Sequence, residues 1–493
     1  MDFIGFLNTT VLDGVNAIND VLTNYILVVL LIGTGLYISI RTKFVQIRCF
    51  GEGWKGVFGN FSLKGDNEEG SMSSFQSLCT AVGGQVGTGN IVGVCSALLV
   101  GGPGAVFWVW IISFFGMATN YAEAVLAQKT KRKDADGNTL GGPVYYIQAA
   151  FKGGLGKFLA GFFAIAITLA LGIMGCMVQS NAMAGVISSA SNEVIPTWGV
   201  GIVVVALSLW VFLGGTTRLA SITEKIVPAM AVFYIVGALA VLITHIPQLG
   251  EAFVLIFTYA FTPWSAAGGV VFSVFAAISR GANRGLFANE AGMGSTPHAH
   301  ALAEVKKPHE QGVVAMMGVF ICSYFVVSLT GIVVVTTLYT SGGDVSNSIL
   351  QYGDSFAAAL KAEGIDNNSL AQLAFSKLFT SGPANWFVAI ALFFFAFSTI
   401  IAWNMFGKIN MQYLFGKKAV IPFCLFACVC MFIGSLVESD LVWALADLFN
   451  MLMVIPNVFA LIALGGVVGK IALGKDDTFG MPGDEKKEVE ASA

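Results

Sequence analysis

The sequence predicts an all-α integral membrane protein with about eleven transmembrane helices. Of its 493 residues, 56% are hydrophobic and 11% are charged, whereas soluble globular domains carry about 25% charged residues. The apolar runs last about twenty residues, the length of helix that crosses a ~30 Å hydrocarbon core. Outer-membrane strands would instead alternate over segments of roughly ten residues. Helices are therefore expected, and a barrel is not.

Charged residues and clusters of Gly or Pro bound the apolar runs. The predicted helices cover residues 22–40, 72–100, 103–128, 156–190, 198–215, 226–246, 266–297, 311–340, 385–406, 419–437 and 441–469. With the N-terminus outside, every Lys and Arg except Lys361 and Lys377 lies on the cytoplasmic side. This positive-inside asymmetry predicts a cytoplasmic C-terminus. The expected location is the plasma membrane, which in a bacterium is the inner membrane. The first helix lacks the basic flank of a cleaved signal peptide and is expected to stay as an anchor.

Two predicted helices contain stretches that interrupt a helix, at residues 83–90 and 279–285. Each stretch lies in the first helix of a block of five, so the two blocks cross the membrane in opposite senses. Interrupted helices at matching positions of inverted blocks indicate a transporter's binding site. The expected organisation is an N-terminal segment with an extra helix and a cytoplasmic loop (1–71), a first five-helix repeat (72–246), an extracellular linker (247–265), a second, inverted repeat (266–470) and a charged cytoplasmic tail (471–493).

The first interruption suits the recognition of a carboxylate. Its glycines leave the helix unwound and are expected to expose the amides of Thr88, Gly89 and Asn90 at the positive N-terminal end of a half-helix. The alternative is close helix packing through small residues, which does not require the polar Gln85 and Asn90. A dinucleotide-binding loop is disfavoured, because the glycine spacing and the apolar surroundings do not fit one.

Four runs of sequence carry a family resemblance: GGQVGTGNI (83–91), GGPGAVFW (101–108), GGPVYYI (141–147) and RGLFANEAGMGS (284–295). They resemble the alanine or glycine:cation symporter family, and the resemblance spans nearly the whole chain. It implies a leucine-transporter-type 5+5 inverted repeat preceded by one extra helix. It also implies co-transport of sodium with alanine, glycine or a related small neutral amino acid. The coupling ion would be Na+, with no organic cofactor, and the partners would be the amino acid and the lipid bilayer.

By that resemblance, the sodium site lies between the second and ninth predicted helices. It would comprise Gly83, Val86, Phe395, Ser398 and Thr399. Backbone carbonyls and neutral hydroxyls are the ligands that transporters offer to Na+. The alternative for Ser398 and Thr399 is a hydroxyl bonded to a carbonyl one turn earlier in its own helix.

The predicted substrate site draws on both interrupted helices. The resemblance places a substrate-contacting polar group at Gln179, where the alternative is an interhelical hydrogen bond. Trp403 is interpreted as a wall of the pocket or, nearly as well, as a core or interfacial tryptophan. The predicted substrate-binding residues are Gln85, Gly87, Thr88, Gly89, Asn90, Gln179, Phe275, Gly281 and Trp403.

Ionisable residues in or beside the apolar segments are candidate gates. They are Asp447, Glu123, Arg280, Arg284 and Glu290. Glu123 and Glu290 are expected near the cytoplasmic face in pairs with basic residues, Arg280 and Arg284 being the candidates. Asp447 is expected to line the outer vestibule. The chain departs from the family pattern with MFGK at 405–408, where members commonly have YYGE, and with Ala288 in place of Ser.

Other function classes lack the residues they need. One broken helix per half forms no channel ring, and no convergent acid, base and nucleophile indicate an enzyme. His298 and His300 are expected in a solvated loop and not in a metal site. A net charge of −3 without a basic stripe excludes nucleic acid as a partner. Proton coupling and a glutamine or serine substrate stay open as alternatives, and the oligomeric state is not determined.

Overall fold

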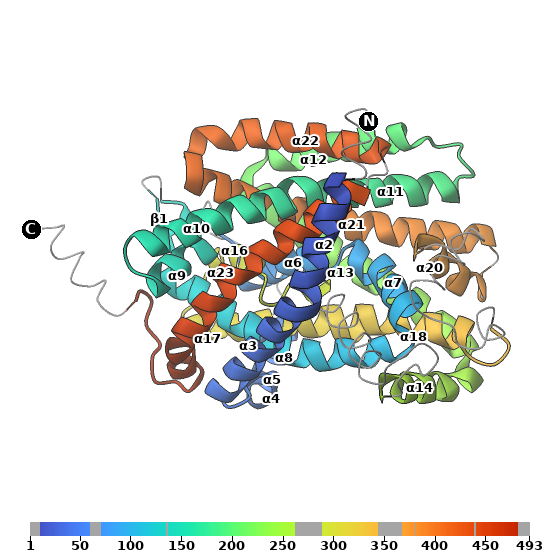
Figure 1. Cartoon of the computed structure of the whole chain (residues 1–493), viewed down its shortest axis with the longest axis horizontal. Coiled ribbons are helices and arrows are strands. Elements are labelled where there is room, and N and C mark those ends of the chain that lie inside the picture. The colour runs from blue at the N-terminus through green and yellow to red at the C-terminus, as the bar shows by residue number, and fades with distance from the viewer. Residues whose placement is uncertain are drawn as a thin grey trace, which may run out of the picture.

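The computed structural model is almost entirely helical (Figure 1). It describes residues 10–59, 71–134, 137–261, 288–343, 367–379, 381–437 and 440–481. The elements up to residue 261 are α2 (Leu12–Val21), η2 (Leu22–Leu27), α3 (Val28–Arg41), α4 (Val45–Arg48), α5 (Phe50–Phe58), α6 (Ser74–Gln85), η3 (Thr88–Asn90), α7 (Val92–Gly101), α8 (Gly104–Thr130), β1 (Arg132–Lys133), β2 (Thr139–Leu140), α9 (Pro143–Ala150), α10 (Gly154–Ile167), η4 (Thr168–Gly175), α11 (Cys176–Ala190), α12 (Thr197–Phe212), α13 (Gly215–Thr244) and α14 (Ile246–Phe261).

The later elements follow in the same helical pattern. They are α16 (Pro297–Ala301), α17 (Pro308–Phe320), η5 (Ile321–Val327), α18 (Ser328–Val334), η6 (Val335–Tyr339), α20 (Asn367–Ser376), α21 (Ser381–Phe415), η8 (Lys417–Ala419), α22 (Val420–Leu436) and α23 (Asp440–Ala472). The labels η3 and η8 mark 3-10 turns, and the other η labels mark π-helical turns inside longer helices. The two short strands form an antiparallel hairpin in which Arg132 faces Leu140.

Seven helices in the described residues are long and apolar enough to cross a membrane. They are Gly104–Thr130, Gly154–Ala190, Gly215–Thr244, Pro308–Tyr339, Ser381–Phe415, Lys417–Leu436 and Asp440–Ala472. Four shorter apolar helices accompany them, namely Val29–Arg41, Val92–Gly101, Thr197–Phe212 and Ile246–Phe261. The protein is therefore a multi-pass membrane protein. Most of the predicted helix 266–297 lies outside the described residues, so the count of eleven and the inverted repeat stay predictions.

Several helices extend beyond their predicted ends. The helix predicted at 22–40 begins at Leu12, the one predicted at 226–246 begins at Gly215, and the one predicted at 385–406 ends at Phe415. Each prediction stopped where charged or polar residues begin, but such residues stay helical where a helix leaves the apolar core. Much of the predicted linker 247–265 is itself helical, as α14.

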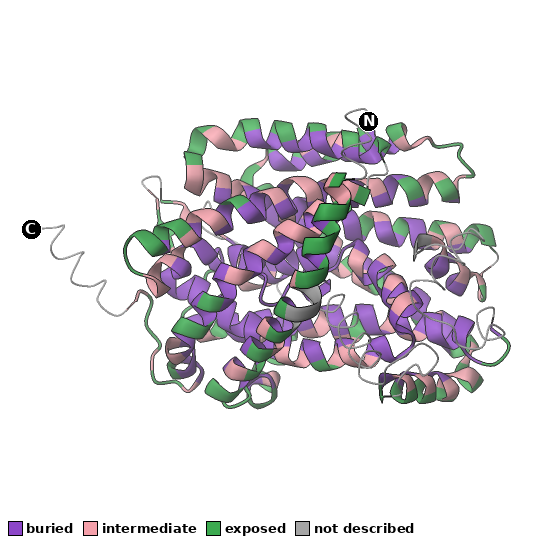
Figure 2. Ribbon diagram, viewed as in Figure 1, coloured by how far each residue is buried: buried purple, intermediate pink, exposed green. Residues whose placement is uncertain are grey.

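The long helices α8, α17, α21 and α22 lie roughly parallel, and α2, α3 and α23 cross them obliquely (Figure 1). Helix α17 packs along α8, and α21 packs along α11. A Cβ on Gly312 would meet the Tyr121 ring at 2.7 Å, so this glycine lets α17 approach α8 closely. Buried residues concentrate in the interior, and green exposed residues cover the outer faces (Figure 2). Large apolar side chains such as Trp210, 57% exposed, lie among them, as expected of a surface that faces lipid.

The interruption predicted in the second helix is confirmed. Helix α6 begins with a capping box, because the Ser73 hydroxyl accepts from the Gln76 N–H and the Gln76 side chain accepts from the Ser73 N–H, both at 3.1 Å. The helix ends at Gln85, and Gly87 is extended with φ −118° and ψ −157°. A single turn, η3, separates it from α7. Six residues of irregular backbone thus lie inside the protein, where membrane proteins tolerate them only if they are buried or line a cavity.

Candidate functional site

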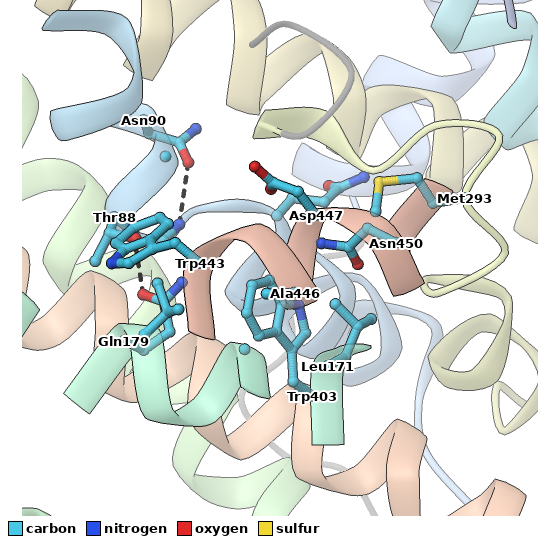
Figure 3. A pocket seen from close by; sticks show the side chains of 16 residues that line it. Thr88, Asn90, Leu171, Gln179, Met293, Trp403, Trp443, Ala446, Asp447 and Asn450 are labelled. Atoms are coloured by element: carbon cyan, nitrogen blue, oxygen red, sulfur yellow. Dashed lines mark hydrogen bonds between the residues drawn. The ribbon is translucent and has the colours of Figure 1, made fainter. Parts of the chain in front are cut away.

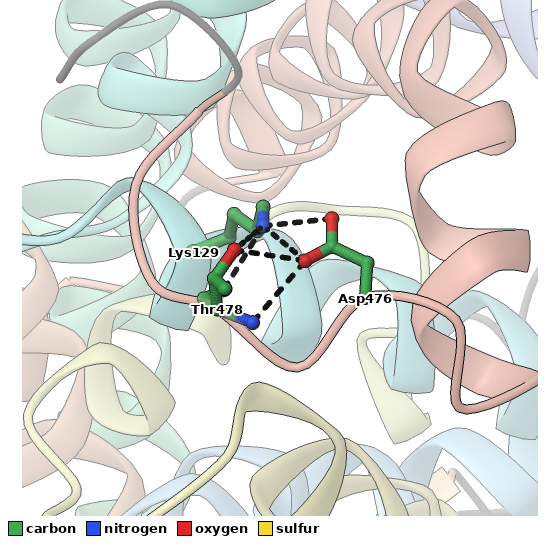
Figure 4. A network of polar contacts seen from close by, with 3 residues as sticks. All are labelled: Lys129, Asp476 and Thr478. Atoms are coloured by element: carbon green, nitrogen blue, oxygen red, sulfur yellow. Dashed lines mark hydrogen bonds and ion pairs between the residues drawn. The ribbon is translucent and has the colours of Figure 1, made fainter.

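A cavity of about 80 Å³ lies beside the interruption between α6 and α7 (Figure 3). Side chains from α11, α21 and α23 complete its wall. The lining residues are Gly84, Gln85, Gly87, Thr88, Gly89, Asn90, Leu171, Gly175, Val178, Gln179, Met293, Trp403, Trp443, Ala446, Asp447 and Asn450. Seven of the nine predicted substrate-binding residues are among them. The other two, Phe275 and Gly281, lie outside the described residues.

The protein itself binds two of the three amides that were expected to be exposed. The Thr88 N–H donates to the Gln179 side-chain oxygen at 3.2 Å, and the Asn90 N–H donates to the Gly87 carbonyl at 3.1 Å. The Asn90 side chain accepts from the Gly87 N–H at 3.0 Å, which holds the turn together (Figure 3). Gly89 differs, because no atom lies within 4 Å of the position that a Cβ would take there. The space beside Gly89 is therefore open, whereas the amides of Thr88 and Asn90 already have acceptors.

Asn450 lines the cavity and carries an unused acceptor. Its side-chain oxygen is buried and has no hydrogen-bond partner among the residues that the structure describes. Asp447 lies three residues earlier on α23, and both side chains line the cavity (Figure 3). The sequence analysis singled out Asp447 but missed Asn450. The three-residue spacing from an intramembrane acid was the available signal, since it places both residues on one helix face.

Trp403 and Gln85 are held in place by the segment that follows residue 287. The Trp403 indole N–H donates to the Glu290 carboxylate at 2.5 Å, and the Gln85 side-chain nitrogen donates to the Asn289 carbonyl at 2.7 Å. Trp403 therefore forms a fixed wall of the cavity. Gln85 ties the end of α6 to the neighbouring segment.

Four of the five predicted sodium-site residues, Gly83, Phe395, Ser398 and Thr399, bring neutral oxygens together in a cluster between α6 and α21. The Thr399 hydroxyl donates to the Gly83 carbonyl at 2.8 Å, and the Ser398 hydroxyl lies 3.3 Å from the same oxygen. Both hydroxyls also lie within 3.0 Å of the Phe395 carbonyl one turn earlier, so the back-bonding alternative is observed, and the role of these hydroxyls as sodium ligands stays a prediction. Val86, 1% exposed, directly follows α6, and its N–H donates to the Val82 carbonyl.

The cluster meets the demands of a sodium site in donor type and in burial. Its carbonyl and hydroxyl oxygens are neutral, and Ser398 and Thr399 are at most 1% exposed. The cluster also shares a wall with the cavity. A Cβ on Gly87 would lie 2.6 Å from the Thr399 hydroxyl and 3.3 Å from the Gln179 amide.

Glu123 binds a turn of backbone, not a cation, among the described residues. Its carboxylate accepts from the N–H groups of Gly292 at 3.2 Å and Gly294 at 2.9 Å, and from the Asn457 side chain at 2.6 Å. Gly292 and Gly294 have φ of +84° and +78°, conformations that favour glycine. No basic residue pairs with Glu123 among the described residues, and the candidate partners Arg280 and Arg284 lie outside them. Glu123 instead holds together α8, α23 and the 292–294 turn.

Glu290 also has neutral partners. Its carboxylate accepts from the Ser295 hydroxyl and from Trp403, and its own backbone has φ +56°, which is uncommon for a residue other than glycine. The proposed basic partners Arg280 and Arg284 lie outside the described residues. Within those residues, Glu290 orients the tryptophan wall of the cavity.

The expectation of a solvated loop around His298 and His300 was wrong. Both residues are fully buried. The His298 Nδ1 donates to the Ser295 carbonyl and its Nε2 accepts from Asn410, each at 2.8 Å. Burial lowers the pKa of His298 to about 4, so the ring is neutral at pH 7. The tertiary fold covers this segment with α6, α8 and α21, which short-range sequence patterns do not reveal.

Comparisons with known proteins agree with this architecture. Residues 8–475 match the family described as the sodium:alanine symporter family. The chain is 37% identical to the sodium/alanine symporter AgcS of Methanococcus maripaludis, over 95% of this chain and 96% of that protein. It is 38% identical to the putative sodium/proton-dependent alanine carrier protein YrbD of Bacillus subtilis, over 92% and 90%. It is 34% identical to the probable sodium/glutamine symporter GlnT of the same organism, over 91% and 87%.

A solved structure resembles the fold. The crystal structure of an Eremococcus coleocola manganese transporter mutant matches with a TM-score of 0.51 at 14% identity, over 85% of this chain and 81% of that one. At that identity the likeness concerns the fold alone. The family match and the relatives above show the family of the chain, since both extend over nearly its whole length. The protein is a transporter and not an enzyme, and it belongs to the sodium:alanine symporter family.

Proposed function

We propose that this protein couples inward movement of sodium to uptake of a small neutral amino acid of the alanine or glycine type. One observation carries the proposal: Gly87 lines the cavity and at the same time adjoins the cluster, because a Cβ there would lie 2.6 Å from the Thr399 hydroxyl and 3.3 Å from the Gln179 amide. An ion and an organic substrate would therefore bind at neighbouring sites that share this glycine.

The cavity suits a small zwitterion. The open space at Gly89 lies at the N-terminal end of α7, where the helix dipole favours a carboxylate. The unpartnered Asn450 oxygen would accept a hydrogen bond from the ammonium group. A volume of about 80 Å³ is far below the roughly 300 to 1,000 Å³ of sites for drug-sized ligands. This size favours alanine or glycine over glutamine.

Sodium would bind between the Gly83 and Phe395 carbonyls and the hydroxyls of Ser398 and Thr399. Each hydroxyl now donates to a carbonyl, and on ion binding it would rotate so that a lone pair faces the ion. The ligands are neutral, so the ion's charge stays uncompensated. Because the amino acid is a zwitterion, each sodium would carry one net charge inward, worth ~2.3 kcal/mol per 100 mV of membrane potential.

Coupling follows from the shared backbone. An ion at the Gly83 carbonyl would set the geometry of residues 83–90, and the same residues wall the cavity. Sodium would then raise substrate affinity, and by linkage substrate would raise sodium affinity by the same factor. The proposal includes a five-plus-five inverted repeat, a location in the bacterial inner membrane, and an external N-terminus with a cytoplasmic C-terminus, as the positive-inside asymmetry indicates.

Proton coupling is the second candidate. Asp447 lines the cavity, and the Glu290 carboxylate binds the wall residue Trp403 from behind, so one carboxyl group lines the proposed substrate site and a second lies next to its wall. A proton-driven carrier requires such a titratable group on the transport path. One relative is named as sodium/proton-dependent.

Uptake by the purified protein in proteoliposomes separates these candidates. Radiolabelled alanine, glycine, serine and glutamine would be offered under an inward sodium gradient, with choline replacing sodium in one control and an inward pH gradient replacing it in another. We expect electrogenic, sodium-dependent uptake of alanine or glycine, with glutamine excluded. Uptake driven by the pH gradient without sodium would overturn the sodium assignment, and glutamine uptake equal to alanine uptake would overturn the substrate assignment.

A further inference from the structure

A second, larger pocket lies on the outer surface and shares no lining residue with the cavity. It measures about 760 Å³ and opens between α12, the first half of α13 and α21. The lining residues are Leu207, Trp210, Gly214, Thr217, Arg218, Ser221, Ile222, Lys225, Ile226, Phe393, Phe394 and Phe397. We call it the lateral groove. Trp210, 57% exposed, and Phe394, 36% exposed, lie at its opening, so the groove faces the lipid side of the protein.

One end of the lateral groove is cationic. Arg218 and Lys225 are seven residues apart on α13, which places them on one helix face about 10 Å apart. The Arg218 guanidinium lies 5.2 Å from the Trp210 ring, and one of its N–H groups donates to the Trp210 carbonyl at 2.7 Å, which fixes it at the rim. Its other N–H groups stay available, since arginine has five. Hydroxyls of Thr217 and Ser221 line the same end.

The charge of this end is not compensated locally. Among the described residues, no acidic side chain lines the groove. Neither Arg218 nor Lys225 forms an ion pair with a carboxylate in the described part of the chain. The neighbouring Glu224 is 5% exposed and binds the Gln76 side chain on the inner face of α13. The groove therefore offers two positive charges to an anion.

The other end is apolar and aromatic. Phe393 and Phe397 stack with ring centroids 5.9 Å apart, and Phe394 lies beside them on α21. The predicted membrane span of α13 begins at residue 226, so the cations lie at the bilayer surface and the aromatic end lies in the hydrocarbon. This depth profile matches a molecule with an anionic head and an apolar tail.

We infer that the lateral groove binds an anionic phospholipid. Its phosphate would accept hydrogen bonds from Arg218 and Lys225, with Thr217 and Ser221 as further donors, and one acyl chain would lie against Phe393, Phe394 and Phe397. A zwitterionic lipid is a poorer occupant, because its ammonium group would meet two cations. Basic pockets between helices at a membrane surface are the usual sites of such recognition.

The groove also lies directly behind the candidate sodium cluster. Phe397 immediately precedes Ser398, whose hydroxyl is 3.5 Å from the Met230 sulfur on α13. Ile226 immediately precedes Val227, whose Cγ2 lies 3.3 Å from the position of a Cβ on Gly83. A bound lipid would brace α13 against α21, and we expect this to raise sodium affinity. This consequence rests on the proposed function, whereas the lipid binding does not.

Native mass spectrometry of the purified full chain tests the binding. Phosphatidylglycerol and phosphatidylcholine with identical acyl chains would be titrated onto wild type, Lys225→Gln, and the Arg218→Gln/Lys225→Gln double variant. We expect wild type to prefer phosphatidylglycerol and the double variant to bind it at least about tenfold more weakly. Lys152→Gln/Lys157→Gln is the matched control, since it also removes two exposed cations, and we expect it to bind like wild type. Equal phosphatidylglycerol binding by the double variant, or equal binding of the two lipids by wild type, would overturn the inference.

Lys225→Gln is included as a variant that should fold normally, because Lys225 is exposed. We expect it to show part of the loss, and wild-type binding by this correctly folded variant would count against the inference. A sodium titration of uptake in phosphatidylethanolamine vesicles containing either phosphatidylglycerol or phosphatidylcholine tests the consequence. We expect phosphatidylglycerol to lower the sodium concentration for half-maximal uptake in wild type but not in the double variant. If wild type shows no sodium-driven uptake at all, the proposed function is refuted and the lipid-binding result stands.

Discussion

The cavity and the hydroxyl cluster both adjoin Gly87, yet they differ in whether their polar groups have hydrogen-bond partners. In the cavity, the Asn450 oxygen has no partner among the described residues, and Gly89 faces open space. In the cluster, the hydroxyls of Ser398 and Thr399 both already donate to carbonyls. The cavity can therefore bind a substrate that supplies its own hydrogen-bonding groups. The cluster must give up hydrogen bonds when it binds an ion.

This difference bears on the order of events in transport. A buried polar atom without a partner costs free energy, of the order of 1 to 3 kcal/mol, until a ligand satisfies it. Substrate binding therefore recovers this free energy in the cavity. Ion binding in the cluster gains only the difference in free energy between the new ion–oxygen contacts and the hydrogen bonds that are lost. Weak intrinsic sodium binding that strengthens with substrate is the expected behaviour.

Replacing Gly87 is expected to have the largest effect, because it damages both regions together. A Cβ in Gly87→Ala would lie 2.6 Å from the Thr399 hydroxyl, closer than side-chain carbons approach other atoms. We expect transport to fall to background, with both sodium and substrate binding lost. Radiolabelled uptake and equilibrium substrate binding by the purified variant measure this.

Gly89→Ala, in the same turn, is the control for Gly87→Ala. Its Cβ meets no atom within 4 Å, so the sodium cluster stays intact. We expect it to weaken only substrate binding, since the methyl group enters the cavity. If both variants lose sodium dependence equally, the methyl group at position 87 does not act through the sodium cluster.

Ser398→Ala and Thr399→Ala test the role of the cluster alone. Each removes one proposed ligand, and we expect the sodium concentration for half-maximal uptake to rise roughly 5- to 30-fold, the equivalent of ~1 to 2 kcal/mol. Substrate affinity at saturating sodium should change little, because linkage acts only through ion occupancy. Uptake measured against sodium at several alanine concentrations separates the two effects.

Thr34→Ala provides the control for these hydroxyl variants. Thr34 is 1% exposed, and its hydroxyl bonds only the Leu30 carbonyl one turn earlier in α3. We expect normal sodium dependence from it. Wild-type sodium dependence in both Ser398→Ala and Thr399→Ala would remove the site assignment.

Asn450→Ala is expected to give the smallest effect, confined to the cavity. It removes an acceptor that has no described partner, so folding should be unaffected, and apparent substrate affinity should fall several-fold, by ~1 kcal/mol. The matched variant is Asn457→Ala, two turns later on α23. Asn457 bonds Glu123 and the Gly292 carbonyl, so its loss should lower thermal stability instead. An unchanged half-saturation concentration in Asn450→Ala would place the ammonium group elsewhere.

Some features could be predicted from local sequence and others could not. The break at residues 86–91 was predictable, because consecutive glycines and polar side chains disfavour a continuous membrane helix. The partners of Glu123 were not, because they depend on the 292–294 turn lying against α8 and α23. The buried environment of His298 was missed for the same reason: its neighbours on other helices are distant in sequence.

The sequence by itself determined that the chain crosses the membrane repeatedly, that its second helix is interrupted near residues 83–90, and which family it belongs to. These features follow from composition, from runs of apolar residues and from contiguous motifs, all of which act over short distances along the chain. Only the tertiary structure decided that Gln179 occupies the Thr88 amide, that Asn450 holds an unused acceptor, and that both the Thr399 hydroxyl and the Gln179 amide lie close to Gly87. The Thr88 and Thr399 contacts join helices more than ninety residues apart in the sequence, and the geometry of such contacts is set by the whole fold.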